Sequence, residues 1–332
     1  MFHLPTTSMP LIRVRILAPF LAMCAIAAGA TEPPPDAVVA ADGSGQYRTV
    51  QDAIVKAPQS ASAEKPWVIL VKPGIYKELV YVQREKRFIH LIGEDPKTTV
   101  ITFALGPKMI GLDGKEIGTF RTPTADIDAD DFTVSNITFE NSSGKVGPAL
   151  AIRVDGDRDV FQHCVFRGYQ DTILLNRGRQ YFENCSITGA TDFIFGGATA
   201  FFDRCEIHCT GNGYITAAST PDSQPFGFVF SDCAITGDAP GLKTYLGRPW
   251  RAFGSVIFLN TTMSDVVRPE GWFNWNDPAR EKTARYAEFN STGAGANPGS
   301  RVGWSRQLPV AEAGKITVES VLGGPDHWDP VH

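Results

Sequence analysis

The stretch FQHCVFRGYQDTILLNRGRQYFENCSITGATDFIFGGATAFFDRCEI, residues 161–207, contains one short pattern three times, and FSDCAI at 230–235 adds a fourth copy. Each copy has an aromatic residue, a cysteine three positions later and an apolar residue two positions after that. The cysteines follow one another at steps of 21, 20 and 28 residues, and FENSS at 139–143 begins 22 residues before the first copy. The chain therefore repeats a structural unit of about 20 to 22 residues.

A unit of this length is too short for a helical hairpin, and it is rich in Val, Ile, Phe and Thr with Gly and Asn between the apolar runs. We therefore predict an all-β fold, a single-stranded right-handed parallel β-helix, in which each coil stacks about 4.8 Å from the last. Leucine-rich repeats have a similar period, but their leucine and asparagine spacing is absent. The aromatic positions of successive coils would form an internal ladder of Phe139, Phe161, Phe182, Phe202 and Phe230.

The regions on either side of the repeats look different. ADGSGQYRTVQDAIVKAP (41–58) predicts a turn and a short helix, with Thr49 as N-cap and Asp52 three residues on. This helix would cover the open end of the solenoid, where strand edges lack partners. After about Gly237 the period fades, so LGRPWRAFG (246–254) and RPEGWFNWNDP (268–278) predict long loops on one side, before a C-terminal packing segment that ends near Trp328.

The N-terminal residues 1–30 resemble a secretory signal rather than part of the fold. Arg13 and Arg15 precede the apolar run ILAPFLAMCAIAA (16–28), and small residues allow cleavage after Ala27 or Ala30. A lipoprotein signal at Cys24 is the alternative, although Met23 is bulky where a small residue is expected. We therefore expect a secreted protein, periplasmic or extracellular, without a membrane span, whose residues 31–332 form one domain.

Composition narrows the possible partners. The 332 residues carry 31 basic and 36 acidic side chains, a formal net charge of −5, and no basic tract, so nothing favours nucleic acid as a partner. Loss of the signal would leave five cysteines, Cys164, Cys185, Cys205, Cys209 and Cys233. In an oxidising compartment an odd number permits at most two disulfides and leaves one free thiol.

Two aspartates hold the same position in successive repeats. Asp171 lies seven residues after Cys164, and Asp192 lies seven residues after Cys185. Stacked coils would place both carboxyl groups on one outer groove, where two such neighbours cannot both ionise easily near neutral pH. The pair then offers an acid beside a nucleophile or base, although aspartates in register can also cap turns, bind structural calcium or face water.

Four motifs accompany these acids: GIYKE (74–78), YQDTILL (169–175), DFIFG (192–196) and YLGRPW (245–250). With them the chain resembles the pectin methylesterases, or pectinesterases, from ADGSGQYRTVQDAI (41–54) to VLGG (321–324). The resemblance implies a right-handed parallel β-helix that hydrolyses the methyl esters of pectin, releasing methanol, with no metal and no cofactor. We expect it to act as a monomer.

The resemblance also implies roles for individual residues. Asp192 looks like the nucleophile, Asp171 like the general acid and base, and Gln170 like an oxyanion donor. Arg248 and Trp250 look like the groups that hold Asp192 and the sugar. These residue types suit the chemistry, since a guanidinium keeps a carboxylate charged and an amide can stabilise an oxyanion.

Other implied roles concern Thr119 and the cysteines. Thr119 in TFRTPT (119–124) resembles a position near the substrate, and Cys185 with Cys205 matches a family disulfide, although Cys164 sits on the same ladder.

One position departs from the family pattern. A second glutamine is usual one coil before Gln170, and Pro148 stands there. Proline has neither a side-chain amide nor a backbone N–H, so it cannot donate to an oxyanion. A slower esterase, a replacement donor from a loop and a pectin-binding protein without turnover are the three explanations. We favour the esterase because both acids, Gln170 and Arg248 remain.

The sequence lacks the sets of residues that other enzyme classes would need. A pectate lyase would need a calcium cluster of acids and a base, and a polygalacturonase would need acids spaced for glycoside hydrolysis; neither is evident. There is no G-x-S-x-G elbow for a serine esterase and no H-E-x-x-H for a zinc hydrolase.

Overall fold

The structure is a computed structural model that describes residues 1–3 and 34–331. The chain separates into two units, Met1–Pro34 and Pro35–His332. The expected signal segment, residues 1–30, lies almost entirely outside the described residues, so the fold below is that of the second unit.

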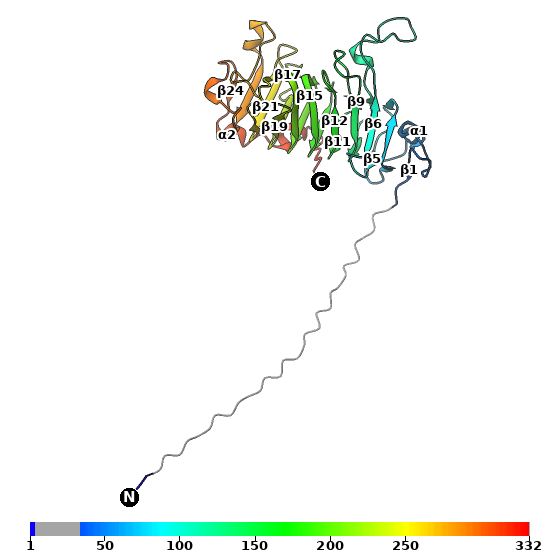
Figure 1. The fold of residues 1–332 in the computed structure, drawn as a ribbon, viewed down its shortest axis with the longest axis horizontal. Coiled ribbons are helices and arrows are strands. Elements are labelled where there is room, and N and C mark those ends of the chain that lie inside the picture. The colour runs from blue at the N-terminus through cyan, green and yellow to red at the C-terminus, as the bar shows by residue number, and fades with distance from the viewer. Residues whose placement is uncertain (4–33, 332) are drawn as a thin grey trace. The chain divides into compact units, whose positions relative to one another are not determined.

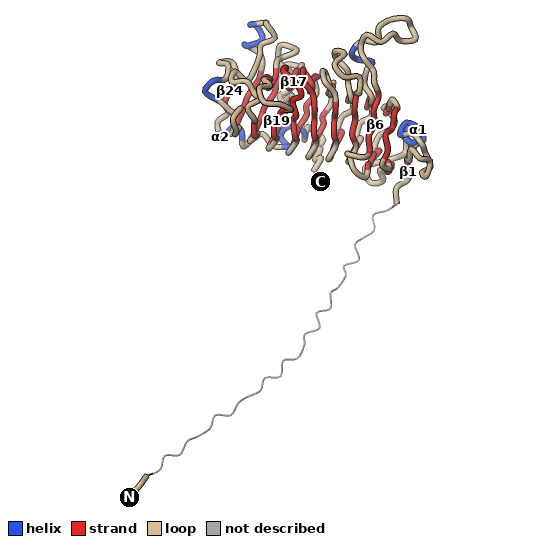
Figure 2. Tube along the Cα trace, in the orientation of Figure 1, coloured by secondary structure: helices blue, strands red, loops and turns tan. Residues whose placement is uncertain are grey.

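This unit is the predicted parallel β-helix, whose coils follow one another along the body in Figures 1 and 2. One face is an 11-stranded sheet, here sheet A, in which every pairing is parallel. Its strands in spatial order are β1 (Ala37–Val39), β2 (Trp67–Val71), β5 (Ile89–Gly93), β8 (Thr133–Ser135), β11 (Asp159–Gln162), β14 (Arg179–Glu183), β16 (Thr199–Asp203), β18 (Phe228–Ser231), β21 (Ser255–Leu259), β23 (Arg285–Phe289) and β24 (Arg306–Gln307).

The second sheet, sheet B, has 13 strands in two arms. The first arm contains β3 (Gly74–Lys77), β6 (Thr99–Phe103), β9 (Thr138–Asn141) and β12 (Val165–Arg167), and it continues to β19 (Ala234–Gly237) and β22 (Thr262–Met263). The other arm contains β4 (Val80–Val82), β7 (Ala125–Ile127), β10 (Ile152–Val154) and β13 (Ile173–Leu175), and it continues to β20 (Thr244–Gly247). The arms join because β15 (Ser186–Gly196) and β17 (Glu206–Ala218) are long enough to belong to both.

Aromatic rings stack through the interior, as predicted, but the ladder has a different first member. Phe161, Phe182, Phe202, Phe230 and Phe258 stack with successive ring centroids 4.7, 4.7, 4.4 and 4.5 Å apart. Phe139 was wrongly placed in it: this residue lies on sheet B and pairs with Phe166, while Val134 occupies the coil position before Phe161. The FENSS segment therefore resembles the start of the repeat in sequence but does not occupy the equivalent position in the coil.

Helices lie at the N-terminal end of the solenoid and on the outer face of sheet A. Helix α1 (Val50–Lys56) begins at Thr49, whose hydroxyl accepts a hydrogen bond from the Asp52 backbone N–H at 3.1 Å, as predicted. Near the C-terminus, α2 (Val310–Ala313) and α3 (Val318–Leu322) pack on sheet A with Trp328, which also lies 5.6 Å from the Arg179 guanidinium.

Two long connections project from the same side of the coil stack; the second contains the predicted loop 268–278, whereas the first was not predicted, and the predicted loop 246–254 begins within β20. Figures 1 and 2 show the segment between β6 and β7 (teal in Figure 1) and the segment between β22 and β23 (orange) on the same edge. They carry the short 3-10 turns η1 (Thr119–Arg121) and η2 (Pro278–Lys282), and a third, η3 (Pro298–Ser300), follows β23. In the parts of the chain with described coordinates, no helix has both the length and the apolar character needed to cross a membrane.

The cysteines occupy the interior as free thiols. All five cysteines among the described residues are buried and unbridged, so the implied Cys185–Cys205 disulfide is not formed in this structure. Each thiol of the ladder instead donates to a carbonyl of the preceding coil, Cys185 to Phe161 at 3.4 Å and Cys205 to Phe182 at 3.6 Å. Because the coils are in register, Cys185 has Cys164 on one side and Cys205 on the other, and the ladder favours no single pair.

The phenylalanine ladder predicts a large loss of stability on truncation. Phe182 is fully buried with a stacked neighbour on each side, so Phe182→Ala should lower the free energy of unfolding by about 3 to 5 kcal/mol. Ile75, whose side chain is 64% exposed on β3, supplies the control, since Ile75→Ala should change it by less than about 0.5 kcal/mol. Guanidinium unfolding of both variants measures the difference, and equal losses would contradict a core role for the ladder.

Candidate active site

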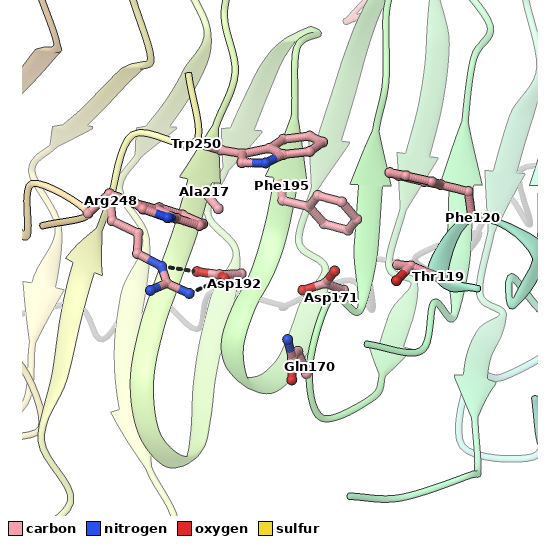
Figure 3. Close-up of a pocket in the computed structure, with 10 residues that line it drawn as sticks. Thr119, Phe120, Gln170, Asp171, Asp192, Phe195, Ala217, Arg248 and Trp250 are labelled. Carbon is pink, nitrogen blue, oxygen red and sulfur yellow. Dashed lines mark hydrogen bonds and ion pairs between the residues drawn. The ribbon is translucent and has the colours of Figure 1, made fainter. Parts of the chain in front are cut away.

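A pocket of about 270 Å³ opens on the outer face of sheet B, where β13, β15, β17 and β20 lie side by side. Its lining brings together every catalytic and substrate-binding residue predicted from the sequence (Figure 3). The lining residues are Thr119, Phe120, Gln170, Asp171, Asp192, Phe195, Ala217, Arg248, Trp250 and Trp275.

The two acids occupy equivalent turns of successive coils, as their phase in the sequence predicts. Gln170 pairs with Thr191 in a parallel bridge, and the Asp171 backbone N–H donates to the Thr191 carbonyl at 3.0 Å. Asp171 and Asp192 both have left-handed backbones, with φ of 60° and 50°. Aspartate tolerates this conformation better than most residues, and the shared turn directs both carboxyl groups into the pocket.

Arg248 holds Asp192 through two hydrogen bonds. Its Nε donates to Asp192 Oδ1 at 2.9 Å and its Nη2 donates to Oδ2 at 2.6 Å, the bidentate geometry that gives the strongest arginine–carboxylate pairs. The guanidinium carbon also lies 3.8 Å from the ring centroids of both Tyr214 and Trp275. The plane of Arg248 is therefore held by an aromatic ring on each face.

Tyr214 and Trp275 were not predicted to belong to the site. The register of the coils could have identified Tyr214, because this residue pairs with Thr191, the neighbour of Asp192. Trp275 had no such signal, since it lies in an irregular segment outside the repeat.

The pKa values of the two acids are shifted unequally, because Arg248 contacts only one of them. Burial, and then the charge of Asp192, raises the pKa of Asp171 to about 8, although Arg248 acts against this. Burial also raises the pKa of Asp192 above its ordinary value, but the hydrogen bonds and charge of Arg248 oppose that effect directly. At neutral pH the pocket thus favours a protonated Asp171, while the guanidinium of Arg248 favours the charged form of Asp192.

Gln170 and Pro148 lie on one ladder. A parallel bridge joins Pro148 to Gln170, so proline does stand one coil before the glutamine, as the spacing predicts. The Gln170 amide lines the pocket and makes no hydrogen bond to another described residue. It is therefore available to a ligand, whereas Pro148 has no donor to offer.

Trp250 and Thr119 lie at the rim. The Trp250 indole packs edge-on against Phe195, with centroids 5.9 Å apart, and it is half-buried. Thr119 lies beside Asp171 in Figure 3, on the turn η1. A hydrogen bond connects the end of this turn with the residues just before β10: the Leu150 backbone N–H donates to the Thr122 hydroxyl at 3.0 Å.

A group of acids lies on the N-terminal side of the pocket. Oxygens of Asp126, Asp128 and Asp155 lie within 4.8 Å of one another, a spacing that a metal ion could use. Arg153 already occupies this place, with its Nε 2.5 Å from Asp155 and 3.9 Å from Asp126. We assign no metal to these acids, because a guanidinium supplies their positive charge.

Comparison with known proteins gives consistent matches. The Pectinesterase family profile matches residues 36–325. Pectinesterase 31 of Arabidopsis thaliana is 42% identical over 295 residues, which cover 86% of this chain and 91% of that protein.

Solved structures match as well. A pectin methylesterase from carrot has a TM-score of 0.83 at 32% identity, over 90% of this chain and 96% of that one. A pectin methylesterase in complex with a hexasaccharide has a TM-score of 0.78 at 31% identity, over 90% of this chain and 99% of that one.

The raised pKa of Asp171 predicts a pH-dependent cost to stability. Because the folded pKa of about 8 exceeds the unfolded value of about 3.9, the unfolded state binds fewer protons between these values, and stability falls as pH rises through this range. Asp171→Asn should therefore be more stable than the native protein, by a margin that grows from pH 4 to pH 8. Guanidinium unfolding at several pH values tests this, with exposed Asp222→Asn as the control; a constant margin would contradict it.

Proposed function

Because the chain belongs to the pectinesterase family of ester hydrolases, we propose that it removes methyl esters from the galacturonate units of pectin and releases methanol. The observation that carries this proposal is the bidentate Arg248–Asp192 pair beside an Asp171 that keeps its proton at neutral pH. A nucleophile and a proton donor in one pocket are the two groups that ester hydrolysis requires.

In the first half of the proposed reaction, Asp192 attacks the ester carbonyl carbon. The carbonyl oxygen becomes an oxyanion, to which the free Gln170 amide can donate a hydrogen bond; such a bond can lower the barrier by about 3 to 4 kcal/mol. The bond to the methoxy group then breaks, Asp171 gives its proton to that oxygen, and methanol leaves. The galacturonate is left joined to Asp192 as an anhydride.

In the second half, water attacks the anhydride carbonyl and Asp171, now ionised, takes a proton from it. The galacturonic acid so formed loses its proton to solvent and leaves as the carboxylate, and both aspartates return to their starting states. Arg248 acts through Asp192: its two hydrogen bonds keep the carboxylate charged and fix its plane before attack.

The residues at the rim of the pocket would bind the sugar rings of pectin. Trp250 presents a flat apolar face at the mouth of the pocket, and Thr119 presents a hydroxyl on the opposite side. The mechanism uses no cofactor or metal. We further propose that residues 1–30 direct secretion, since pectin is an extracellular polymer. We also propose that the domain works as a monomer.

A second function is favoured by one observation, the bridge that puts Pro148 beside Gln170. A pocket with only one amide donor on this ladder would stabilise the oxyanion less, and the chain would then be a weakened esterase or a pectin-binding β-helix without turnover. The retained Asp171, Asp192 and Arg248 favour the esterase.

The esterase proposal predicts methanol release from methyl-esterified pectin. Activity should fall as pH rises above about 8, because Asp171 then loses the proton that methanol needs. Asp192→Ala should abolish release while pectin binding persists. If the native protein releases no more methanol than Asp192→Ala between about pH 5 and 9, and still binds pectin, the binding function replaces the esterase.

The proline predicts a gain of activity. Pro148→Gln would add an amide donor beside Gln170, so we expect the turnover number to rise about tenfold or more, with little change in KM. Pro148→Ala removes the ring without adding a donor and serves as the matched control. An equal rise in both variants would show that removing the proline ring raises turnover and that the added amide does not. No rise in Pro148→Gln would mean that another group already donates to the oxyanion.

A further inference from the structure

We propose that Arg280 is a positioning residue for Arg248, the group that pairs with the nucleophile. This inference rests on the proposed function and deepens it, because it concerns how the reacting carboxylate is held. Arg280 lies on the turn η2 and does not line the pocket, so it acts on the reaction only through other side chains.

Trp275, whose ring lies over the Arg248 guanidinium, is not held in place by the coil. Trp275 and Asn276 follow one another with left-handed backbones, φ of 63° and 56°, and neither belongs to a strand. Two successive residues other than glycine in this conformation cost free energy, which contacts with the surroundings must offset. The 3.8 Å contact between the Trp275 ring centroid and the Arg248 guanidinium carbon therefore depends on interactions that hold this loop.

Arg280 joins this loop to the segment that carries Arg248. Its Nη1 donates to the carbonyl of Pro249, the residue after Arg248, and to the Trp250 carbonyl at 3.3 Å. The Arg280 guanidinium carbon also lies 5.6 Å from the centroid of the Trp275 ring. One side chain thus contacts both of the irregular segments that meet at Arg248.

Arg280 is itself fixed and has its own counter-charge. Its Nε donates to one carboxylate oxygen of Asp277 at 3.1 Å, and the other oxygen of Asp277 caps the turn η2. Two cations, Arg248 and Arg280, lie over the Trp275 ring. Each is paired with a different carboxylate, Asp192 or Asp277, and these pairs reduce the repulsion between the two guanidinium groups.

The plane of Arg248 matters because this residue holds Asp192 through two hydrogen bonds at once. A bidentate pair needs the guanidinium and the carboxylate to share a plane, and a small misplacement of a reacting group lowers the rate strongly. Without Arg280, the Trp275 loop and the Arg248 segment lose their shared anchor. Asp192 is then oriented less well for attack on the ester.

Arg280→Met tests this role through kinetics. Methionine keeps an unbranched apolar stem and has no donor, so we expect kcat on methyl-esterified pectin to fall about tenfold or more, with KM changed less than about twofold. KM should persist because Trp250 keeps its backbone hydrogen bond to the Ala218 carbonyl at 2.9 Å and its contact with Phe195. Arg280→Lys restores a cation with donors and should recover part of the lost kcat. A higher KM with an unchanged kcat would overturn the positioning role.

Arg285 supplies the matched control, since it also donates to a carbonyl of the loop 246–254. Its Nε and Nη2 lie 3.3 and 3.1 Å from the Phe253 carbonyl oxygen, which lies outside the Arg248–Trp250 segment. Arg285→Met should therefore lower the free energy of unfolding and leave kcat unchanged. Equal losses of kcat in Arg280→Met and Arg285→Met would mean that general loosening of the loop is the cause, and would overturn the proposal.

A double variant tests the route through Arg248. In an Arg248→Lys background there is no guanidinium plane to hold, so adding Arg280→Met should lower kcat by less than a further factor of about two. A further loss as large as in the native background would overturn the proposal, because Arg280 would then act independently of Arg248.

A spectroscopic measurement separates failure of this role from failure of the esterase. The Arg248 Nε–H donates to Asp192 Oδ1 at 2.9 Å, and its NMR signal can be assigned by its loss in Arg248→Lys. Exchange of this proton with water should be about tenfold faster in Arg280→Met than in the native protein or Arg285→Met, because exchange reports the population of the opened pair. Faster exchange supports the positioning role even if the protein releases no methanol, and unchanged exchange overturns it whether or not the protein is an esterase.

Discussion

The parallel hydrogen-bond register between successive coils is the constraint on which the rest of this structure depends. The bridge between Gln170 and Thr191 puts Asp171 and Asp192 at the same turn, one coil apart, and the same ladder carries Pro148 on one side and Tyr214 and Tyr245 on the other. A shift of one residue would turn side chains from the outer face to the interior. The phenylalanine stack inside the coils resists such a shift, because its rings are fully buried. Core packing and the placement of the site are therefore consequences of one register.

Electrostatics then distinguishes two residues that the register makes equivalent. Asp171 and Asp192 share a turn type and a similar degree of burial, which raises the pKa of both. Only Asp192 receives the bidentate Arg248, and Arg248 is itself held between Tyr214 and Trp275. Burying an unpaired carboxylate is costly, so one acid is stabilised by the guanidinium and the other by its proton. The chemistry of the pocket comes from this asymmetry, which the repeat itself does not contain.

Much of the fold and the site could be predicted from the chain alone, and the exceptions have physical reasons. The cysteine spacing predicted the coils, and the phase of the two aspartates predicted their juxtaposition. Thr49 was recognised as a cap because capping is a local interaction. Phe139 was misplaced because FENSS resembles the repeat while its strand belongs to sheet B. Phe258 was missed because its coil lacks the cysteine that marks the others. The Cys185–Cys205 disulfide is not formed in the structure, where the ladder gives Cys185 two equivalent neighbours.

The sequence by itself determined the period of the solenoid, the order of its coils, the identity of the acids and the absence of an amide at Pro148, because each of these depends on residue type and spacing along the chain. Only the tertiary structure decided which acid is paired and which rings enclose Arg248. These properties depend on side chains from coils and loops far apart in sequence, such as Asp192 with Arg248 and Arg248 with Trp275. Distances and burial of this kind arise only when irregular loops fold back onto the regular coil, and no spacing in the sequence encodes where those loops come to rest.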